Sequence, residues 1–371
     1  MVRGRREGVL IAGGGIAGCL AALAMARFRP EIPLLIVEEQ ERFGGDCFRF
    51  LFAAELEGEE KALVAPLIGL HWPGYYLAFP DYSRKLKADL GGIAPGAIHA
   101  TMIAALRPDQ YRLGTKVVAV REDALVLDGG EEIRAEGAID ARGAANLSML
   151  DLLYEARLER DYVFRGPHGI DRPVIADATA EAANGLSFTQ LFPLAQDRLL
   201  IADVAIGERA QPDPQAAARL DHYLALRGWR KARVEAERNM SRPLPVGGDL
   251  DAYWRLGGAR VARLGLRGGF LHPATGRTIA DAARIAVLLS RQRDFGGATL
   301  HDVFEEEAKT LWRQRELLRA VNAALAAAEP VERRALFARI NALDPATITR
   351  FQADRMGMVD RRKLQRALRE G

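Results

Sequence analysis

The chain has little of what marks several common protein classes. Its 371 residues include only two cysteines, Cys19 and Cys47, which give neither a zinc-binding spacing nor a disulfide framework. Repeats, low-complexity tracts, a P-loop and the HExxH and GxSxG signatures are also absent. The formal net charge of +3 gives no general affinity for nucleic acid. We therefore expect no bound metal and no nucleic-acid partner.

Long apolar runs are missing as well, and no stretch is long enough to form a transmembrane helix. The hydrophobic content of 49% is ordinary for a soluble globular protein, and the length allows two or three domains. We expect a cytoplasmic protein, or one that lies on the inner face of the cell membrane.

A glycine-rich stretch near the N-terminus is the strongest local signal. Residues 9–12 are apolar and predict a short buried strand, and small apolar residues after the glycines predict a helix. Gly13, Gly15 and Gly18 stand in the G-x-G-x-x-G register between them. In this register the first glycine permits the turn, the second lets backbone approach a pyrophosphate, and the third lets the helix pack on the strand.

An acidic residue at the expected distance strengthens this motif. A second apolar strand over residues 34–37 ends in Glu38, 20 residues after Gly18, where a carboxylate can accept hydrogen bonds from ribose hydroxyls. The alternative is a glycine-rich turn in an ordinary α/β unit. We favour a bound adenine dinucleotide, and a single complete motif favours FAD over separate FAD and NADPH sites.

Two later segments are candidates for further cofactor contacts. A short apolar strand ends at Asp140 in an Asp-x-x-Gly turn, a pattern that often returns the chain to a dinucleotide. Gly268, Gly269, Thr275 and Gly276 precede a predicted helix over residues 279–289, and they suit backbone that passes close to a flat ligand. His272 in this segment has no evident partner and is more simply a packing residue.

An aromatic segment follows the dinucleotide motif. His71, Trp72, Tyr75 and Phe79 lie among prolines, and such a segment either lines an apolar cavity or packs inside a β-sheet. Residues 173–203 alternate short predicted strands with turns, which indicates an antiparallel sheet in a second domain.

The C-terminal region is basic. Residues 331–371 hold ten lysine and arginine residues against five acidic ones, together with an intermittent apolar stripe. The pattern fits either a solvated helical face or an amphipathic surface that rests on anionic lipid.

The order of these segments makes the chain resemble the bacterial lycopene β-cyclase family over nearly its whole length. Several of the matching segments have no counterpart in other flavoproteins. They are residues 13–18, 71–80, 139–143, 173–179, 191–194, 197–201 and 266–276, together with Arg84, Leu86, Trp312 and Asn322.

The resemblance implies an α/β fold with a Rossmann-like FAD-binding domain of the glutathione-reductase type and an inserted antiparallel β-sheet substrate domain. We expect residues 1–52, 95–145 and 255–295 to form the FAD-binding domain. Residues 53–94 and 146–254 then form the substrate domain. Residues 296–371 form a C-terminal helical region in possible contact with membrane lipid.

The resemblance also implies the reaction and the ligands. The family closes β-ionone rings at the ends of the linear polyene lycopene, giving γ-carotene and then β-carotene without net redox change. It requires reduced FAD, with external NAD(P)H as the reductant, and a negatively charged reduced flavin suits the stabilisation of a carbocation. By this resemblance His71, Trp72, Tyr75 and Phe79 contact the polyene.

The chain departs from the family where the chemistry is expected. The acidic side chain of the family's Ile-Glu-Asp-Thr motif is replaced by Ala202, and the next residue, Asp203, is the best surviving candidate for the proton donor. Asp203 can instead be a strand residue that bonds to backbone. Cys47 and Arg277 also stand where the family motifs have other residues.

Two other functions therefore stay open. One is an FAD-dependent oxidoreductase that acts on a hydrophobic substrate. The other is a non-catalytic relative that binds a carotenoid, an interpretation suggested by Ala202.

Overall fold

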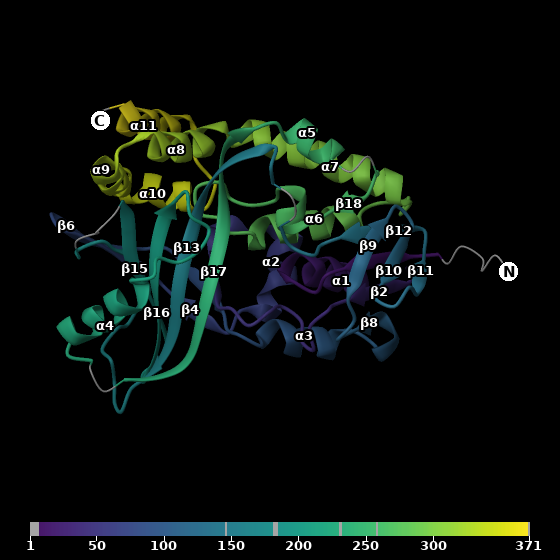
Figure 1. The fold of residues 1–371 in the computed structure, drawn as a ribbon, viewed down its shortest axis with the longest axis horizontal. Coiled ribbons are helices and arrows are strands. Elements are labelled where there is room, and N and C mark those ends of the chain that lie inside the picture. The colour runs from purple at the N-terminus through teal and green to yellow at the C-terminus, as the bar shows by residue number, and fades with distance from the viewer. Residues whose placement is uncertain (1–6, 145–146, 181–184, 230–231, 257–258, 370–371) are drawn as a thin grey trace.

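The computed structural model describes residues 7–144, 147–180, 185–229, 232–256 and 259–369, and the arrangement of its elements can be followed in Figure 1. A parallel sheet in the order β18-β12-β1-β2-β8 forms the half of the molecule that contains the N-terminal motif. Its strands are β1 (Val9–Ala12), β2 (Leu34–Val37), β8 (Tyr111–Arg112), β12 (Gly137–Asp140) and β18 (Ala262–Arg263). The predicted Rossmann-like architecture is confirmed.

Helices cover one side of this parallel sheet. α1 (Ile16–Phe28) is made largely of small apolar residues, and α6 (Ile279–Ser290) packs directly against it in one hydrophobic core. The other helices of this half are α2 (Gly58–Val64), α3 (Ala97–Ala105), α5 (Leu250–Arg255) and α7 (Gly297–Gln314). A small antiparallel sheet of β9 (Val117–Arg121), β10 (Ala124–Leu127) and β11 (Glu132–Arg134) packs on β1 and β12 through a separate apolar cluster.

The second half is built on a long sheet in the order β17-β13-β16-β15-β14-β5-β6, antiparallel throughout except where β14 meets β5. A short antiparallel sheet has the strand order β3-β7-β4. The strands are β3 (Arg49–Phe52), β4 (Leu70–Trp72), β5 (Tyr75–Phe79), β6 (Tyr82–Leu86), β7 (Leu90–Ile93), β13 (Leu150–Val163), β14 (Val174–Asp177), β15 (Leu186–Ala195), β16 (Arg198–Gly207) and β17 (Arg233–Gly248).

The long sheet is covered on both faces, and neighbouring residues of each strand therefore enter different cores. On β16, Leu200, Ala202 and Val204 belong to the core shared with the C-terminal helices. Leu199 and Ile201 belong to the core shared with α4 (Ala216–Leu226). The C-terminal helices are α8 (Glu316–Ala327), α9 (Pro330–Asn341), α10 (Pro345–Gln352) and α11 (Met358–Arg369), which gather at one end of the long strands in Figure 1.

Two segments pack differently from the expected domain division. Leu63 and Val64 of α2 lie in the core of the parallel sheet, although residues 53–94 were expected in the substrate domain. Leu300 and Phe304 of α7 lie in the same core, so the separate C-terminal helical region begins after α7 rather than at residue 296. α2 packs against α6, and α7 packs against β12. The burial of their apolar faces there assigns both helices to the half of the molecule that contains the parallel sheet.

Candidate dinucleotide and substrate site

A cavity of about 440 Å³ opens at the carboxyl ends of β1 and β2, and we call it the dinucleotide cavity. Gly13 and Gly15 line it, and a Cβ built on Gly15 meets no atom within 4 Å, so any side chain there would enter the cavity. Gly15 is also the N-cap of α1 and has no side chain to satisfy the first helical N–H groups. This geometry fits an anionic phosphate placed against backbone.

Gly18 has a different role and does not line the cavity. A Cβ at this position would lie 1.9 Å from the carbonyl oxygen of Gly13, inside the turn itself. Gly13 has a φ of +102°, a conformation that favours glycine. The first and third glycines thus hold the turn and the helix together, and the second leaves the space that a ligand needs.

Glu38 lines the same cavity at the end of β2. Its Oε2 accepts a hydrogen bond from the backbone N–H of Gly14 at 2.5 Å, and its Oε1 accepts one from the N–H of Gln40 at 2.9 Å. Each oxygen keeps a second lone pair, so the fixed carboxylate can still accept from a ribose hydroxyl.

Asp140 lies behind the cavity lining and contacts it through an arginine. Two hydrogen bonds, of 2.9 and 2.8 Å, join its carboxylate to Arg142, which lines the cavity. Arg267 is a second partner at 3.1 Å. The bonds to Asp140 raise the pKa of Arg142, so this cation is held ionised beside the expected cofactor. Asp140 therefore positions a cation, and sequence reasoning missed Arg142 as the residue that faces the ligand.

The four residues predicted as cofactor contacts at positions 268–276 do not all line the dinucleotide cavity. Gly276 lines the dinucleotide cavity, with a φ of +63°. Gly268 and Gly269 line neither cavity; a Cβ on Gly268 would meet the ring of Phe270 at 2.5 Å, so this glycine serves the local turn. Gly265, which was not predicted, lines the dinucleotide cavity instead.

A second, smaller cavity of about 60 Å³ lies against the long sheet, and we call it the apolar cavity. Thr275 lines it, together with apolar side chains of β14, β15, α8 and α9. It shares three lining residues with the dinucleotide cavity, Phe50, Arg242 and Arg277. A group bound in one cavity is thus separated from the other by single side chains.

Arg277 is a buried cation at the boundary of the two cavities. Its guanidinium lies 5.3 Å from the ring centre of Phe50 and 5.2 Å from that of Phe52, and it pairs with Glu55 at 3.2 Å. It also donates to the side chain of Gln352 in α10 at 3.1 Å. Burial raises the pKa of Glu55, against the opposing effect of Arg277.

The predicted polyene contacts lie in the core rather than at the apolar cavity. Trp72 packs against an aromatic cluster with Phe48 and Phe192, and Tyr75 packs edge-on against Phe52 at 5.4 Å. Phe79 is buried beside Phe337, which does line the cavity, whereas His71 is exposed. The segment forms strands β4 and β5, so it packs within β-sheets, which was the alternative interpretation.

Asp203 lies on the face of the long sheet that α4 covers. Its carboxylate accepts two hydrogen bonds from Arg219 of α4, at 2.7 and 2.8 Å, and it lines neither cavity. Ala202 is on the opposite face, toward the C-terminal helices. This placement argues against Asp203 as the proton donor, because successive residues of a strand point to opposite sides.

A buried charged row on β13 was missed. Glu155, Arg157 and Glu159 are all buried, and Arg157 lies 3.5 Å from Glu155 and 3.3 Å from Glu159. Burial lowers the pKa of Arg157, and the two carboxylates oppose that effect. Glu155 lines the apolar cavity and accepts a hydrogen bond from Arg242 at 3.2 Å. Charge at every second position of residues 155–161 is the sequence signal that could have revealed this row.

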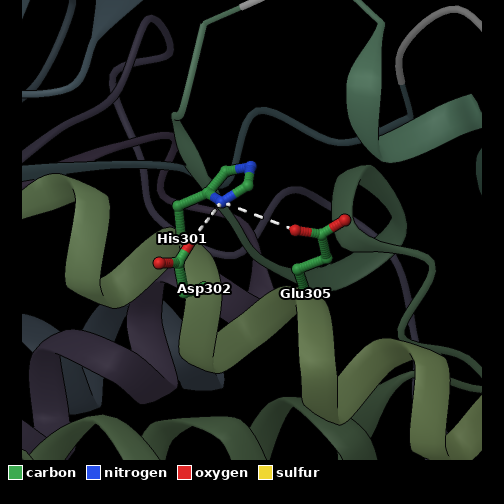
Figure 2. A group of neighbouring side chains, drawn as sticks. All are labelled: His301, Asp302 and Glu305. Carbon is green, nitrogen blue, oxygen red and sulfur yellow. Dashed lines mark hydrogen bonds and ion pairs between the residues drawn. The ribbon is translucent and has the colours of Figure 1, made fainter. Parts of the chain in front are cut away.

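One group of possible metal ligands lies elsewhere, on α7. Figure 2 shows His301, Asp302 and Glu305, with the Nδ1 of His301 at 3.2 Å from Asp302 and 3.7 Å from Glu305. Asp302 also pairs with Arg260, and Glu305 pairs with Lys309 at 2.9 Å. These cations already offset the carboxylates, so the group is an ion-pair network.

Within the described residues, no helix combines the length and the apolar character that crossing a bilayer requires.

Comparison with known proteins places these features in one family. The family model described as lycopene cyclase protein matches residues 8–367. The chain is 29% identical to the lycopene beta-cyclase of Pantoea ananas, over 96% of this chain and 93% of that protein. It is 27% identical to the lycopene beta-cyclase of Paracoccus sp., over 96% and 92%.

Solved structures with low sequence identity share the fold. A geranylgeranyl bacteriochlorophyll reductase-like protein from Thermoplasma acidophilum superimposes with a TM-score of 0.68 at 14% identity, over 99% of this chain and 96% of that one. A flavin-dependent halogenase from Xanthomonas campestris gives 0.62 at 14% identity, over 98% and 94%. With a family model that spans almost every residue and this flavoprotein-like architecture, the chain belongs to the lycopene cyclase family.

Proposed function

We propose that the chain is an FAD-dependent lycopene β-cyclase that closes β-ionone rings at the ends of lycopene without net redox change. The observation that carries this proposal is the shared boundary of the two cavities. Phe50, Arg242 and Arg277 separate the dinucleotide cavity from the apolar cavity by one layer of side chains. A flavin and a polyene end can therefore lie close together, as a cyclase requires.

The residues present fit FAD. The open space over Gly15 and the unfilled start of α1 suit its pyrophosphate, Glu38 suits a ribose, and Arg142 supplies a cation at the wall. When bound in its reduced form, FAD supplies negative charge beside a developing cation. We propose external NAD(P)H as the reductant, because the sequence holds a single dinucleotide motif.

The protein's own part is to hold the polyene end and to exclude water. The apolar cavity lies between the long sheet and the residues Val321 and Leu325 of α8 and Phe337 and Ile340 of α9. Its volume of about 60 Å³ is below the roughly 300 Å³ at which small-molecule sites begin. Binding of the polyene therefore requires this cavity to widen.

The direct test is conversion of lycopene. Expression of the chain in a lycopene-accumulating bacterium, followed by pigment chromatography, is expected to yield γ-carotene and β-carotene. Purified protein with bound, reduced FAD is expected to give the same products without consuming NAD(P)H in proportion to product. Unchanged lycopene in the presence of FAD-loaded protein would contradict the proposal.

A second candidate function is non-catalytic binding of a carotenoid. It is favoured by Ala202, which faces the C-terminal core where the family resemblance implies an acidic side chain. In this case the FAD-loaded protein would bind lycopene, with a shift of the polyene absorbance, and would release it unchanged.

We also propose peripheral contact with the inner face of the cell membrane through α11. Met358 and Val359, at its start, are 77% and 65% exposed. Arg362 and Arg369 of the same helix are exposed as well. Exposed apolar side chains beside basic ones suit an anionic lipid surface, the source of the substrate.

A further inference from the structure

The charged row on β13 is buried on a largely apolar face of the long sheet. Glu155, Arg157 and Glu159 point to the face of the long sheet that is otherwise filled by apolar side chains such as Val204 and Phe188. Burying an ion typically costs several kcal/mol even after relaxation. Buried charged groups beside a ligand cavity are candidates for function, since their environment changes their protonation.

The two carboxylates have different environments. Both guanidinium contacts of Glu155, with Arg157 and with Arg242, are made to its Oε1. Glu159 has no exposed surface, and its Oε2 lies 3.3 Å from Arg157. Arg238 of β17 stands directly opposite it in the strand pairing. Both oxygens of Glu159 nevertheless lack a hydrogen bond within the described structure, whereas the Oε1 of Glu155 lies against two arginines.

Glu159 does not line the apolar cavity, but it lies on the same face of the long sheet, two strands away from a residue that does. It lies directly opposite Ala202 of β16, and Ala202 lies directly opposite Gln190 of β15, which lines the cavity. Facing Cβ atoms in such a ladder are about 5 Å apart. Ala202 carries only a methyl group, and within the described structure the Oε1 of Gln190 on its far side is likewise without a hydrogen-bond partner.

We propose that Glu159 is the proton donor of the cyclisation and that the carboxylate of Glu155, at the cavity wall, stabilises the cation. This proposal rests on the proposed cyclase function. The acid thus reaches the polyene from β13, across Ala202, rather than from β16 itself.

The proposed step is balanced within the protein and its substrate. The O–H bond of Glu159 breaks, and its proton forms a C–H bond at the terminal double bond of the polyene, which leaves a tertiary carbocation. The π electrons of a second double bond form the ring C–C bond. A ring proton then passes to the Glu159 carboxylate, so the acid is restored and no oxidant or reductant is consumed.

The test uses full-length protein loaded with FAD, reduced, and supplied with lycopene in lipid vesicles. Glu159→Gln is expected to keep its flavin absorbance and to lose at least about 100-fold of the conversion rate, the lower range for loss of a general acid. The matched control is Asp203→Asn, one residue from Ala202 on the other face, which is expected to convert lycopene at close to the wild-type rate.

Two further variants separate chemistry from folding. In the double variant Glu159→Gln/Ala202→Glu a carboxyl returns on the same face from the neighbouring strand, and partial recovery of conversion is expected. Glu159→Asp keeps the acid one methylene shorter, so its expected result is reduced conversion with a shifted pH profile. If Glu159→Gln fails to bind FAD, Glu159→Asp decides the question.

Wild-type conversion by FAD-loaded Glu159→Gln, or an unchanged rate and pH profile in Glu159→Asp, would overturn the role of Glu159 while leaving the cyclase function intact. Failure of the wild-type protein to convert lycopene would instead reject the proposed function, and the two failures are therefore distinguishable.

Discussion

Asp203 and Arg219 form a doubly hydrogen-bonded ion pair on the face of the long sheet that lies away from both cavities. The two bonds, of 2.7 and 2.8 Å, join β16 to α4, and the carboxylate is almost completely buried. The nearest acidic residue to Ala202 in the sequence is therefore committed to holding a helix on the sheet.

Asp203→Asn is accordingly expected to change stability rather than chemistry. The asparagine leaves Arg219 partly buried without its charge partner, which costs about 1–3 kcal/mol of the free energy of unfolding. Urea denaturation measures this loss. Asp213→Asn is the control and is expected to cost less, because it removes the charge of a more distant partner of Arg219, at 3.5 Å, and keeps an Oδ1 that can accept from the N–H of Gln215. Loss of lycopene conversion in FAD-loaded Asp203→Asn would contradict this assignment.

The sequence predicted the dinucleotide half well because its signals are local. The strand, the three glycines, the helix and Glu38 lie within 30 residues, and each has its own spacing rule. The same rules also distinguish Gly18, where the helix packs closely on the turn, from Gly15, which leaves space for a ligand. Arg142 was missed because no spacing rule predicts that it pairs with Asp140, two residues earlier, and lines the cavity.

The substrate half was harder to predict because its site depends on pairing between distant strands. Which of Ala202 and Asp203 faces the cavity is a matter of register, and a shift of one residue reverses the answer. Glu159 comes near Ala202 only because β13 pairs with β16 across about 40 residues of sequence. The aromatic segment at 71–79 was equally ambiguous, since large aromatic side chains suit a sheet core as well as a cavity.

The glycines of the N-terminal motif make a second prediction. Gly18→Ala is expected to destabilise the protein by about 1–3 kcal/mol, because its Cβ would overlap the carbonyl oxygen of Gly13. Gly15→Ala is expected to leave stability nearly unchanged and to weaken FAD binding, because its methyl group enters open cavity. Thermal unfolding without FAD and fluorescence titration with FAD measure the two effects. Equal losses of stability in both variants would contradict the division of roles.

His272 makes stability depend on pH. Its ring is buried, its Nε2 lies 3.0 Å from the carbonyl oxygen of Phe351, and burial, aided by Arg277, lowers its pKa to about 4. In the unfolded chain the pKa is about 6.5, so the unfolded state binds the proton more readily between these values. The neutral ring's contribution to stability is therefore complete above pH 6.5 and declines as the pH falls toward 4.

The matching experiment compares wild type with His272→Gln, which can still donate a hydrogen bond to the Phe351 carbonyl. Tm is measured from pH 7.5 to 4 for both proteins. The wild type is expected to lose roughly 3 kcal/mol more stability over this range than the variant does. Parallel curves for the two proteins would show that His272 does not take part.

The exposed apolar start of α11 gives the last prediction. Met358→Asp/Val359→Asp replaces two exposed apolar side chains with negative charges beside Arg362, so it removes insertion and weakens attraction to anionic lipid together. Sedimentation with vesicles of phosphatidylcholine and phosphatidylglycerol is expected to show loss of the bound fraction at low salt. The matched control is Leu226→Asp, because Leu226 is 69% exposed on α4, at a distance in the chain from the basic C-terminal region. Equal loss of binding in Leu226→Asp, or wild-type binding by the double variant, would place the lipid contact elsewhere. Retained FAD absorbance in every variant shows that the fold is intact, so a change in sedimentation then reports on the α11 surface alone.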